Sequence, residues 1–131
     1  DFPDNGEFDV IVMNHVIEHV ENPVQILSNI RERLSDTGVF IIGTPDFDSA
    51  AARRYGSNFR LLHDPTHISL FSSDSMHRCL RDCGFSIMSV EYPYFNTPYF
   101  NKENLLLMLN DNQISPPFYG SKMTFFVNKK G

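Results

Sequence analysis

Residues 8–45 read FDVIVMNHVIEHVENPVQILSNIRERLSDTGVFIIGTP, and this stretch decides the fold of the 131-residue chain. Its first seven residues, Phe8 to Asn14, form an apolar run with β-branched side chains, which is typical of a strand buried on both faces of a parallel sheet. The Asn-Pro pair at 22–23 predicts the start of a helix near 23–35, because asparagine suits the N-cap and proline the first helical position. A second strand is expected near 39–44, and strand, helix and strand in this order indicate a right-handed parallel crossover.

The remainder of the chain continues the alternation of helices and strands. Ser73 and Gly84 bracket a second helix near 74–83, since serine is a good N-cap and glycine commonly ends helices. The other expected elements are a short helix at 50–55, strands near 85–92 and 122–128, and an insertion at 93–117 that is rich in proline, asparagine and tyrosine. These elements predict one α/β domain spanning 1–131, built on an open and mostly parallel sheet.

The composition excludes several classes of partner. The chain has a net charge of -5 and a pI of about 5.4, so it lacks the concentrated basic surface that nucleic acids or anionic membranes attract. No apolar run approaches the ~20 residues that span a bilayer. Cys79 and Cys83 are four residues apart on the second predicted helix, which does not indicate a disulfide framework. We therefore expect a cytoplasmic protein that binds neither nucleic acid nor membrane.

A series of short motifs within 8–45 comes in a characteristic order. It consists of Glu-His-Val at 18–20, Asn-Pro at 22–23, Leu34, Gly38 and Thr-Pro at 44–45. The series closely resembles the middle of class I S-adenosylmethionine-dependent methyltransferases, above all the small-molecule enzymes related to the ubiquinone-biosynthesis O-methyltransferases. Looser matches continue the resemblance to about Tyr92, namely Arg54-Tyr55-Gly56, His67, Phe71-Ser72, Leu80 and Gly84-Phe85.

The resemblance implies a fold, a cofactor and a reaction. The fold would be the C-terminal half of a Rossmann-like methyltransferase sheet, mostly parallel with an antiparallel last strand. The cofactor would be S-adenosylmethionine, and the reaction would be O-methyl transfer to a small-molecule acceptor.

One departure separates this sequence from the family's pattern. The family binds its cofactor mainly with a glycine-rich loop after its first strand and an acidic residue at the end of its second, and neither is present here. The first strand of this chain resembles the family's fourth. We therefore expect either part of a domain from a longer protein or a degenerate relative that serves as a non-catalytic binding or scaffold module. By itself the chain is expected to bind S-adenosylmethionine weakly or not at all and to be inactive.

Candidate site residues follow from the strand order, because ligands of an open α/β sheet lie beyond the carboxyl ends of the strands. Here those positions are 14–18 after the first strand and 44–46 after the second. The resemblance implies that Asn14 and His15 face the methionine side of the cofactor and that Val16 and Glu18 also belong to the cofactor-binding set. The alternative is that they simply form the strand-to-helix turn.

Two histidines are the candidate catalytic residues, since histidine is the usual base near neutral pH. His67 lies where the resemblance places a histidine near the substrate pocket, and it could act as a general base or as a hydrogen-bond donor to the substrate. It could equally pin its own loop by bonding to the backbone. His19 could instead pack beneath the cofactor.

The same turn also contains a candidate set of metal ligands. His15, Glu18 and His19 are spaced i, i+3 and i+4, so on a helical turn they point roughly the same way. A His-Glu-His set would suit a transition metal better than magnesium. The simpler interpretation has Glu18 capping the turn and His19 packing under the cofactor, and we predict no metal.

Two surfaces are expected to make further contacts. The aromatic residues in and around the insertion could form a substrate lid, a covering for the sheet or an interface: Tyr92, Tyr94, Phe95, Tyr99, Phe100 and Tyr119. The strand at Phe8 to Asn14 resembles a central strand of the family, so without its usual neighbours its edge would be bare and apolar. Exposed apolar edges pair with partners. We therefore expect self-association through this edge across a two-fold axis.

Overall fold

The structure, a computed structural model, describes residues 6–117 and 120–131, so the predicted aromatic residue Tyr119 lies outside the described residues. Its strands are β1 (Phe8–Asn14), β2 (Leu34–Pro45), β3 (Phe85–Glu91) and β4 (Lys122–Lys129). Its helices are α1 (Pro23–Arg33), α2 (Ala50–Tyr55), α3 (Ser73–Asp82) and α4 (Lys102–Leu107). Single 3-10 turns occur at Ile17–His19, Gly56–Asn58 and Arg60–Leu62.

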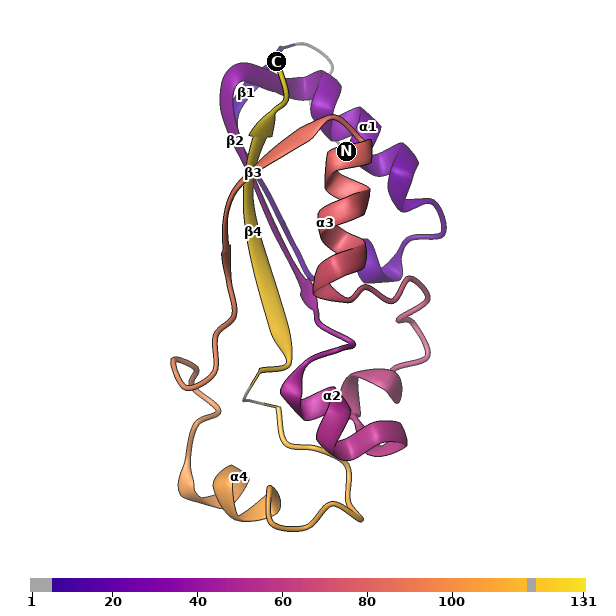
Figure 1. Cartoon of the computed structure of the whole chain (residues 1–131), viewed down its shortest axis with the longest axis vertical. Helices are drawn as coiled ribbons and strands as arrows, with labels where there is room; N and C mark the ends of the chain where they lie inside the picture. Colours follow the sequence, from indigo (N-terminus) through magenta and orange to yellow (C-terminus); the bar gives the residue numbers. More distant parts are fainter. Residues whose placement is uncertain (1–5, 118–119) are drawn as a thin grey trace.

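The four strands form one open sheet in the order β1-β2-β4-β3 (Figure 1). Strand β1 pairs with β2 in parallel, whereas β4 is antiparallel to both β2 and β3. Strands β1, β2 and β3 therefore run in the same direction and the last strand runs against them, which confirms the predicted α/β sheet. Because β4 lies between β2 and β3, it makes antiparallel pairings with both of them.

Helix α1 begins as predicted and ends earlier than predicted. The Asn22 side chain accepts a hydrogen bond of 3.1 Å from the Gln25 amide, as an N-cap should. The helix stops at Arg33, because Leu34 is already extended, fully buried and paired with Phe8 of β1. Gly38 lies further along, within β2. A Cβ at Gly38 would lie 2.8 Å from Leu34 Cδ1 and 3.0 Å from the Phe8 carbonyl oxygen, so the glycine permits close packing.

Strand β1 is buried on one face, not on both as its sequence predicted. Ile11 and Met13 face the core, whereas Val10 and Val12 are 59% and 64% exposed. The reason is that α1 and α3 both lie on the same side of the sheet (Figure 1). Their core side chains are Leu27, Ile30, Met76 and Leu80. The opposite side, here called the open face, carries Val12, Ile41 and Phe126 in one row of paired residues.

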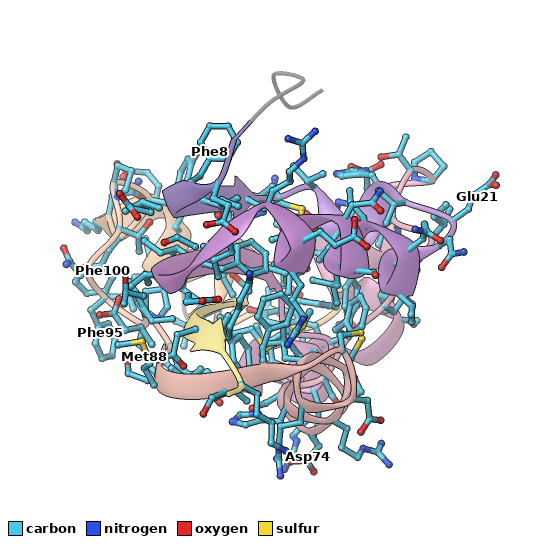
Figure 2. All side chains as sticks on the ribbon, turned by 90° about the horizontal axis from the view of Figure 1, so that it is seen from above. Phe8, Glu21, Asp74, Met88, Phe95 and Phe100 are labelled. Carbon is cyan, nitrogen blue, oxygen red and sulfur yellow. The ribbon has the colours of Figure 1, made fainter. Side chains whose placement is uncertain are left out.

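The open face continues toward the segment that follows β3. Figure 2 shows Met88, Phe95 and Phe100 at one edge of the molecule and Glu21 at the opposite edge. Phe95 and Phe100 pack against each other with ring centroids 5.2 Å apart. The two residues are 58% and 45% exposed, and a role for this aromatic group as a lid, a covering for the sheet or an interface stays a prediction.

The insertion at 93–117 is held by hydrogen bonds to α2 and to the chain that follows α2. Arg54 donates to the Met108 carbonyl oxygen through Nε and Nη2, at 3.2 and 2.6 Å. Asn58 donates to the Asp111 carbonyl oxygen, and the Ser115 amide donates back to Asn58. These bonds hold the insertion and α4 beside α2 at the end of the sheet (Figure 1). Within 6–117 and 120–131, no helix has the length and apolar character needed to cross a membrane.

Candidate functional site

The candidate site begins where β1 ends and the chain turns away from the sheet. His15 has a positive φ of 56°, a conformation that residues other than glycine adopt rarely. Its amide donates to the Gly43 carbonyl oxygen of β2 at 2.9 Å, which holds the turn against the sheet. Such strained positions cluster at functional sites. Val16 follows, and its carbonyl oxygen accepts from the His19 amide at 2.9 Å.

Glu18 is the buried acid of this turn, with a side chain that is 0% exposed. The Thr44 hydroxyl, near the end of β2, donates to Oε2 at 3.1 Å. His15 Nδ1 lies 3.4 Å from Oε1 and His19 Nε2 lies 3.8 Å from it. Oε1 itself receives no hydrogen bond from the described residues. Glu18 is therefore a carboxylate held between strand ends with one oxygen left to interact with further groups.

The electrostatics of Glu18 keep it ionised. Burial alone would raise the pKa of Glu18. The interactions with His15, with its own backbone amide and with the Thr44 hydroxyl outweigh burial and lower that pKa below its ordinary value. The site therefore carries a negative charge at neutral pH.

A second loop, at 64–69, docks onto this turn through four hydrogen bonds. The Glu18 carbonyl oxygen accepts from the amides of Ile68 and Ser69, at 2.8 and 3.0 Å. The Ser69 hydroxyl donates to the Val20 carbonyl oxygen at 2.7 Å. His19 Nδ1 lies 3.0 Å from the Thr66 carbonyl oxygen. Because a carbonyl oxygen can only accept, Nδ1 carries the proton of the neutral ring and Nε2 is left with a free lone pair.

His67 is brought beside His19 by the same loop. The two rings meet edge to face with centroids 4.8 Å apart. His67 Nδ1 donates to the Leu61 carbonyl oxygen at 2.7 Å, and its Nε2 lies 3.4 Å from Asp64 Oδ2. The side chain is 7% exposed. The backbone bond is the loop-pinning arrangement that the sequence left open, and a catalytic role for His67 stays a prediction.

Glu18, His19 and His67 form a possible ion site that differs from the set considered in the sequence. One ligand atom from each lies within 4.8 Å of the others, and His67 takes the place of His15. Each histidine also gives its other ring nitrogen to a carbonyl oxygen, which is the usual outer-shell support of a metal-binding imidazole. Two nitrogens and one oxygen would suit a transition metal. The expectation of no metal stays a prediction.

The predicted residue Asn14 lies apart from the cluster of Glu18, His19 and His67. The Asn14 carboxamide lies against Gly43, where a side chain on Gly43 would collide with Oδ1. Asn14 is exposed at the end of β1, whereas Glu18 is buried beneath the turn. Asn14, His15 and Val16 therefore line the outer side of the turn, and Glu18 supports it from within.

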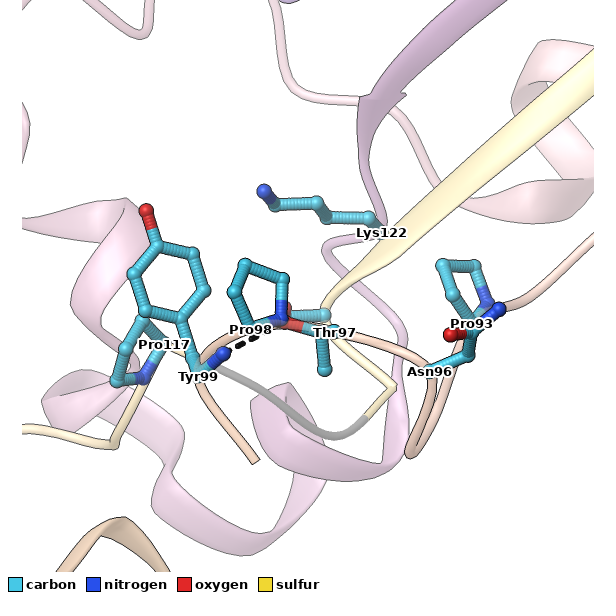
Figure 3. Close-up of a pocket in the computed structure, with 8 residues that line it drawn as sticks. Pro93, Asn96, Thr97, Pro98, Tyr99, Pro117 and Lys122 are labelled. Carbon is cyan, nitrogen blue, oxygen red and sulfur yellow. Dashed lines mark hydrogen bonds between the residues drawn. The ribbon is translucent and has the colours of Figure 1, made fainter. Parts of the chain in front are cut away.

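A cavity of about 300 Å³ lies at the start of β4 (Figure 3). It lies between the insertion and β4, and its walls include Pro93, Thr97, Pro98, Tyr99, Pro117 and Lys122. Lys122 pairs across the sheet with Pro45, the residue after Thr44. The cavity is thus connected through β2 to the strand end that holds Glu18.

Sequence reasoning missed Asp64, Lys122 and Arg60. Asp64 had a usable signal, because Asp-Pro-Thr is a turn in which the Asp64 carboxylate accepts from the Thr66 amide at 2.9 Å. Lys122 had none, since only the pairing of β4 with β2 brings it to the site. Arg60 likewise depends on the fold for its position near Lys122.

Comparisons with known proteins agree with this architecture. A family model described as a methyltransferase domain matches residues 1–90. A S-adenosylmethionine-dependent methyltransferase from Thermotoga maritima, described as a possible histamine N-methyltransferase, is similar with a TM-score of 0.71 and 23% identity, over 99% of this chain and 60% of that one. A putative methyltransferase from Bacillus halodurans is similar with a TM-score of 0.67 and 14% identity, over 100% of this chain and 74% of that one.

A S-adenosylmethionine-dependent methyltransferase from Archaeoglobus fulgidus is also similar, with a TM-score of 0.61 and 16% identity, over 94% of this chain and 60% of that one. At these identities the likeness shows the fold. The chain spans about 60% of the length of the Thermotoga and Archaeoglobus proteins. Among curated protein sequences no significant match was found.

Proposed function

The chain belongs to the methyltransferase-domain family, and from this premise we propose that it forms the acceptor-side half of an enzyme that transfers a methyl group from S-adenosylmethionine to an oxygen atom of a small molecule. One observation carries the proposal beyond the family. The turn after β1 and the loop at 64–69 join at the carboxyl edge of two parallel strands and bring Glu18, His19 and His67 together there. That edge is where ligands of open α/β sheets bind.

The residues of the turn fit one end of the cofactor. The exposed Asn14 carboxamide and the half-buried His15 offer hydrogen-bonding groups, and the Glu18 carboxylate provides negative charge beneath them. These groups suit the methionine end of S-adenosylmethionine, and we propose that Asn14, His15, Val16 and Glu18 hold it. The 131 residues contain no glycine-rich loop for the rest of the molecule. When bound, the cofactor supplies a methyl carbon activated by a sulfonium.

The protein's own task is to align the acceptor and remove its proton. We propose His19 for the proton. Its Nδ1 is engaged by Thr66, its Nε2 has a free lone pair, and its side chain is 36% exposed. Once protonated, the ring faces the Glu18 carboxylate, which stabilises the imidazolium. The hydroxyl proton of the acceptor thus moves to Nε2, and the oxygen becomes the stronger nucleophile.

His67 has a positioning role in this proposal. Its burial keeps it from contacting an acceptor directly, while its edge contact with His19 and its bond to Leu61 fix the loop that binds the His19 ring. Loss of His67 is therefore expected to loosen His19. The alternative function is a binding or scaffold module without catalysis, and methyl transfer by the longer protein distinguishes the two.

The proposal is tested on a protein that includes the remainder of the domain. Transfer of a labelled methyl group from S-adenosylmethionine to a panel of hydroxylated acids and phenols is expected, with turnover reduced about 100-fold or more by His19→Ala. His63→Ala is the matched control, since His63 is an exposed histidine whose ring nitrogen bonds to the Ser57 carbonyl oxygen. Equal turnover for both variants would contradict the role of His19. Absence of transfer to any acceptor, with the cofactor bound, would favour the binding module.

The 131-residue chain provides a separate test of the cofactor site. Calorimetric titration with S-adenosylhomocysteine is expected to give no detectable heat, because the turn serves only one end of that ligand. Saturable micromolar binding would show that the carboxyl-edge residues, or a second copy, suffice to build the pocket.

A further inference from the structure

We propose that the cavity at the start of β4 binds an anionic group of the methyl acceptor, a carboxylate carried on a small flat ring, and that Lys122 is its electrostatic partner. This inference rests on the proposed function, because it specifies the class of acceptor. It draws on residues of the insertion and of β4 that the resemblance to methyltransferases did not cover.

The cavity has the size and walls of a small-molecule site. Its volume of about 300 Å³ accommodates a single substituted ring. Three prolines and Tyr99 supply rigid, largely apolar walls, as Figure 3 shows for Pro93, Pro98 and Pro117. Rigid walls lose little conformational freedom when a flat ligand binds. Among the described lining residues, Lys122 carries the only charged side chain.

Within the described residues, Lys122 has no ion-pair partner. The side chain is partly buried, and no carboxylate of the described residues lies within ion-pair distance of it or of Arg60. Burial and the nearby positive charge of Arg60 lower the pKa of Lys122, and the charge of Glu18 opposes them. Glu18 lies buried beneath the turn beside Thr44 and His15, and it forms no ion pair with Lys122. Lys122 is therefore a cation in the cavity wall that no carboxylate of the described residues pairs with, and an anion in the cavity would be attracted to it.

The location connects this charge to the proposed reaction. Lys122 pairs with Pro45, and the adjacent Thr44 donates to Glu18, the carboxylate beside His19. A ring anchored by its carboxylate at Lys122 therefore lies at the strand edge that carries the proposed base. The charge of Lys122 would select an anionic acceptor, and the proline and tyrosine walls of the cavity would orient the ring of that acceptor.

The test uses three probes of one shape and different charge: benzoate, benzamide and benzylamine. Each is titrated into the 131-residue chain, and binding is followed by amide chemical shifts in NMR spectra. We expect benzoate to bind at least about fivefold more tightly than benzamide, which is about 1 kcal/mol, and benzylamine to bind most weakly. The benzoate preference should also fall as salt is raised, because salt screens a partly exposed charge.

Variants then assign the effect to Lys122. Lys122→Met should remove the preference for benzoate over benzamide, and Lys122→Arg should largely keep it. Lys130→Met, just beyond the other end of β4, is the matched control and should leave the preference unchanged. If Lys122→Met fails to fold, the ranking of the three probes on the unaltered chain still decides the question.

Two results would overturn the inference. Equal affinity for benzoate and benzamide would show that the cavity does not select an anion, and absence of binding by all three probes to the folded chain would remove the cavity as a ligand site. No cofactor is present in these titrations. Benzoate binding through Lys122 together with failed methyl transfer would therefore contradict the proposed function and leave the anion site standing.

Discussion

The Asn14 carboxamide oxygen occupies the space in which a side chain on Gly43 would begin. The two residues are register partners on neighbouring parallel strands, at the carboxyl edge of the sheet. A methyl group on Gly43 would also come within 3.6 Å of Thr124 Oγ1 on the next strand. Gly43 is thus needed for close approach, and it sets where the Asn14 side chain lies.

We therefore expect Gly43→Ala to displace the Asn14 side chain and lower the free energy of unfolding by about 1 kcal/mol or less, because the colliding oxygen ends an exposed side chain that can rotate away. Denaturant unfolding measures the loss. The double variant Asn14→Ala, Gly43→Ala should recover a large part of it, since the colliding carboxamide is gone. If the two changes add without recovery, the collision with Asn14 is not the cause.

The motif-bearing part of the chain was predictable because its signals are local. The N-cap at Asn22 and the order of β1, α1 and β2 follow from residues that are near one another in sequence. Burial of β1 was not predictable in the same way. An apolar strand looks alike whether one or both faces are covered, and only the placement of α1 and α3 on one side of the sheet exposes Val10 and Val12.

The candidate site was likewise predictable only in part. Glu18 and His19 were identifiable from their motif, but the meeting of His19 with His67 depends on hydrogen bonds across 47 and more residues. The position of Lys122 depends on the strand order, in which β4 lies between β2 and β3. Contacts of that range are set by tertiary packing, which a local pattern does not encode.

At His15 we predict that glycine destabilises the fold less than alanine does, which is the reverse of their usual order. Its positive φ costs about 1 kcal/mol in any residue with a Cβ, and glycine avoids this cost. His15→Ala and His15→Gly both lose the contact with Glu18, so they differ mainly in backbone strain. We expect the glycine variant to be the more stable of the two by about 1 kcal/mol. Thermal melts of both variants measure this, and an alanine variant of equal or greater stability would show that the position is not strained.

Asp46 and Glu18 should change stability with pH in opposite directions. Burial raises the pKa of Asp46, and the nearby charge of Asp48 adds to the rise, although the amides of Asp48 and Ser73 oppose it. The folded state therefore holds this proton more tightly than the unfolded chain, so its contribution favours folding in acid and is lost as pH rises. The pKa of Glu18 is lowered in the folded state. Glu18 therefore stabilises the fold at pH values above its pKa in the unfolded chain, and this stabilisation is lost as pH falls.

Asp46→Asn should accordingly gain stability relative to the unaltered chain as pH rises from about 3 to 7, while keeping an oxygen to accept the Asp48 amide. Glu18→Gln should lose stability relative to the unaltered chain over the same range. Denaturant midpoints measured at several pH values decide both. Parallel curves for the two variants would contradict the opposite assignments.

The outer edge of β1 leads to the last prediction, which concerns self-association. Val10 and Val12 are exposed on β1, and no described strand pairs with its outer edge. Such an edge offers unpaired backbone groups and apolar surface to a second copy. We expect light scattering after size exclusion to give a dimer or larger species at micromolar concentration. Val12→Lys should shift it toward monomer, because lysine on an edge strand blocks pairing, whereas Val24→Lys, at a residue 57% exposed on α1, should not. A clean monomer for the unaltered chain would contradict the prediction. Equal effects of Val12→Lys and Val24→Lys would show that the interface does not lie at the edge of β1.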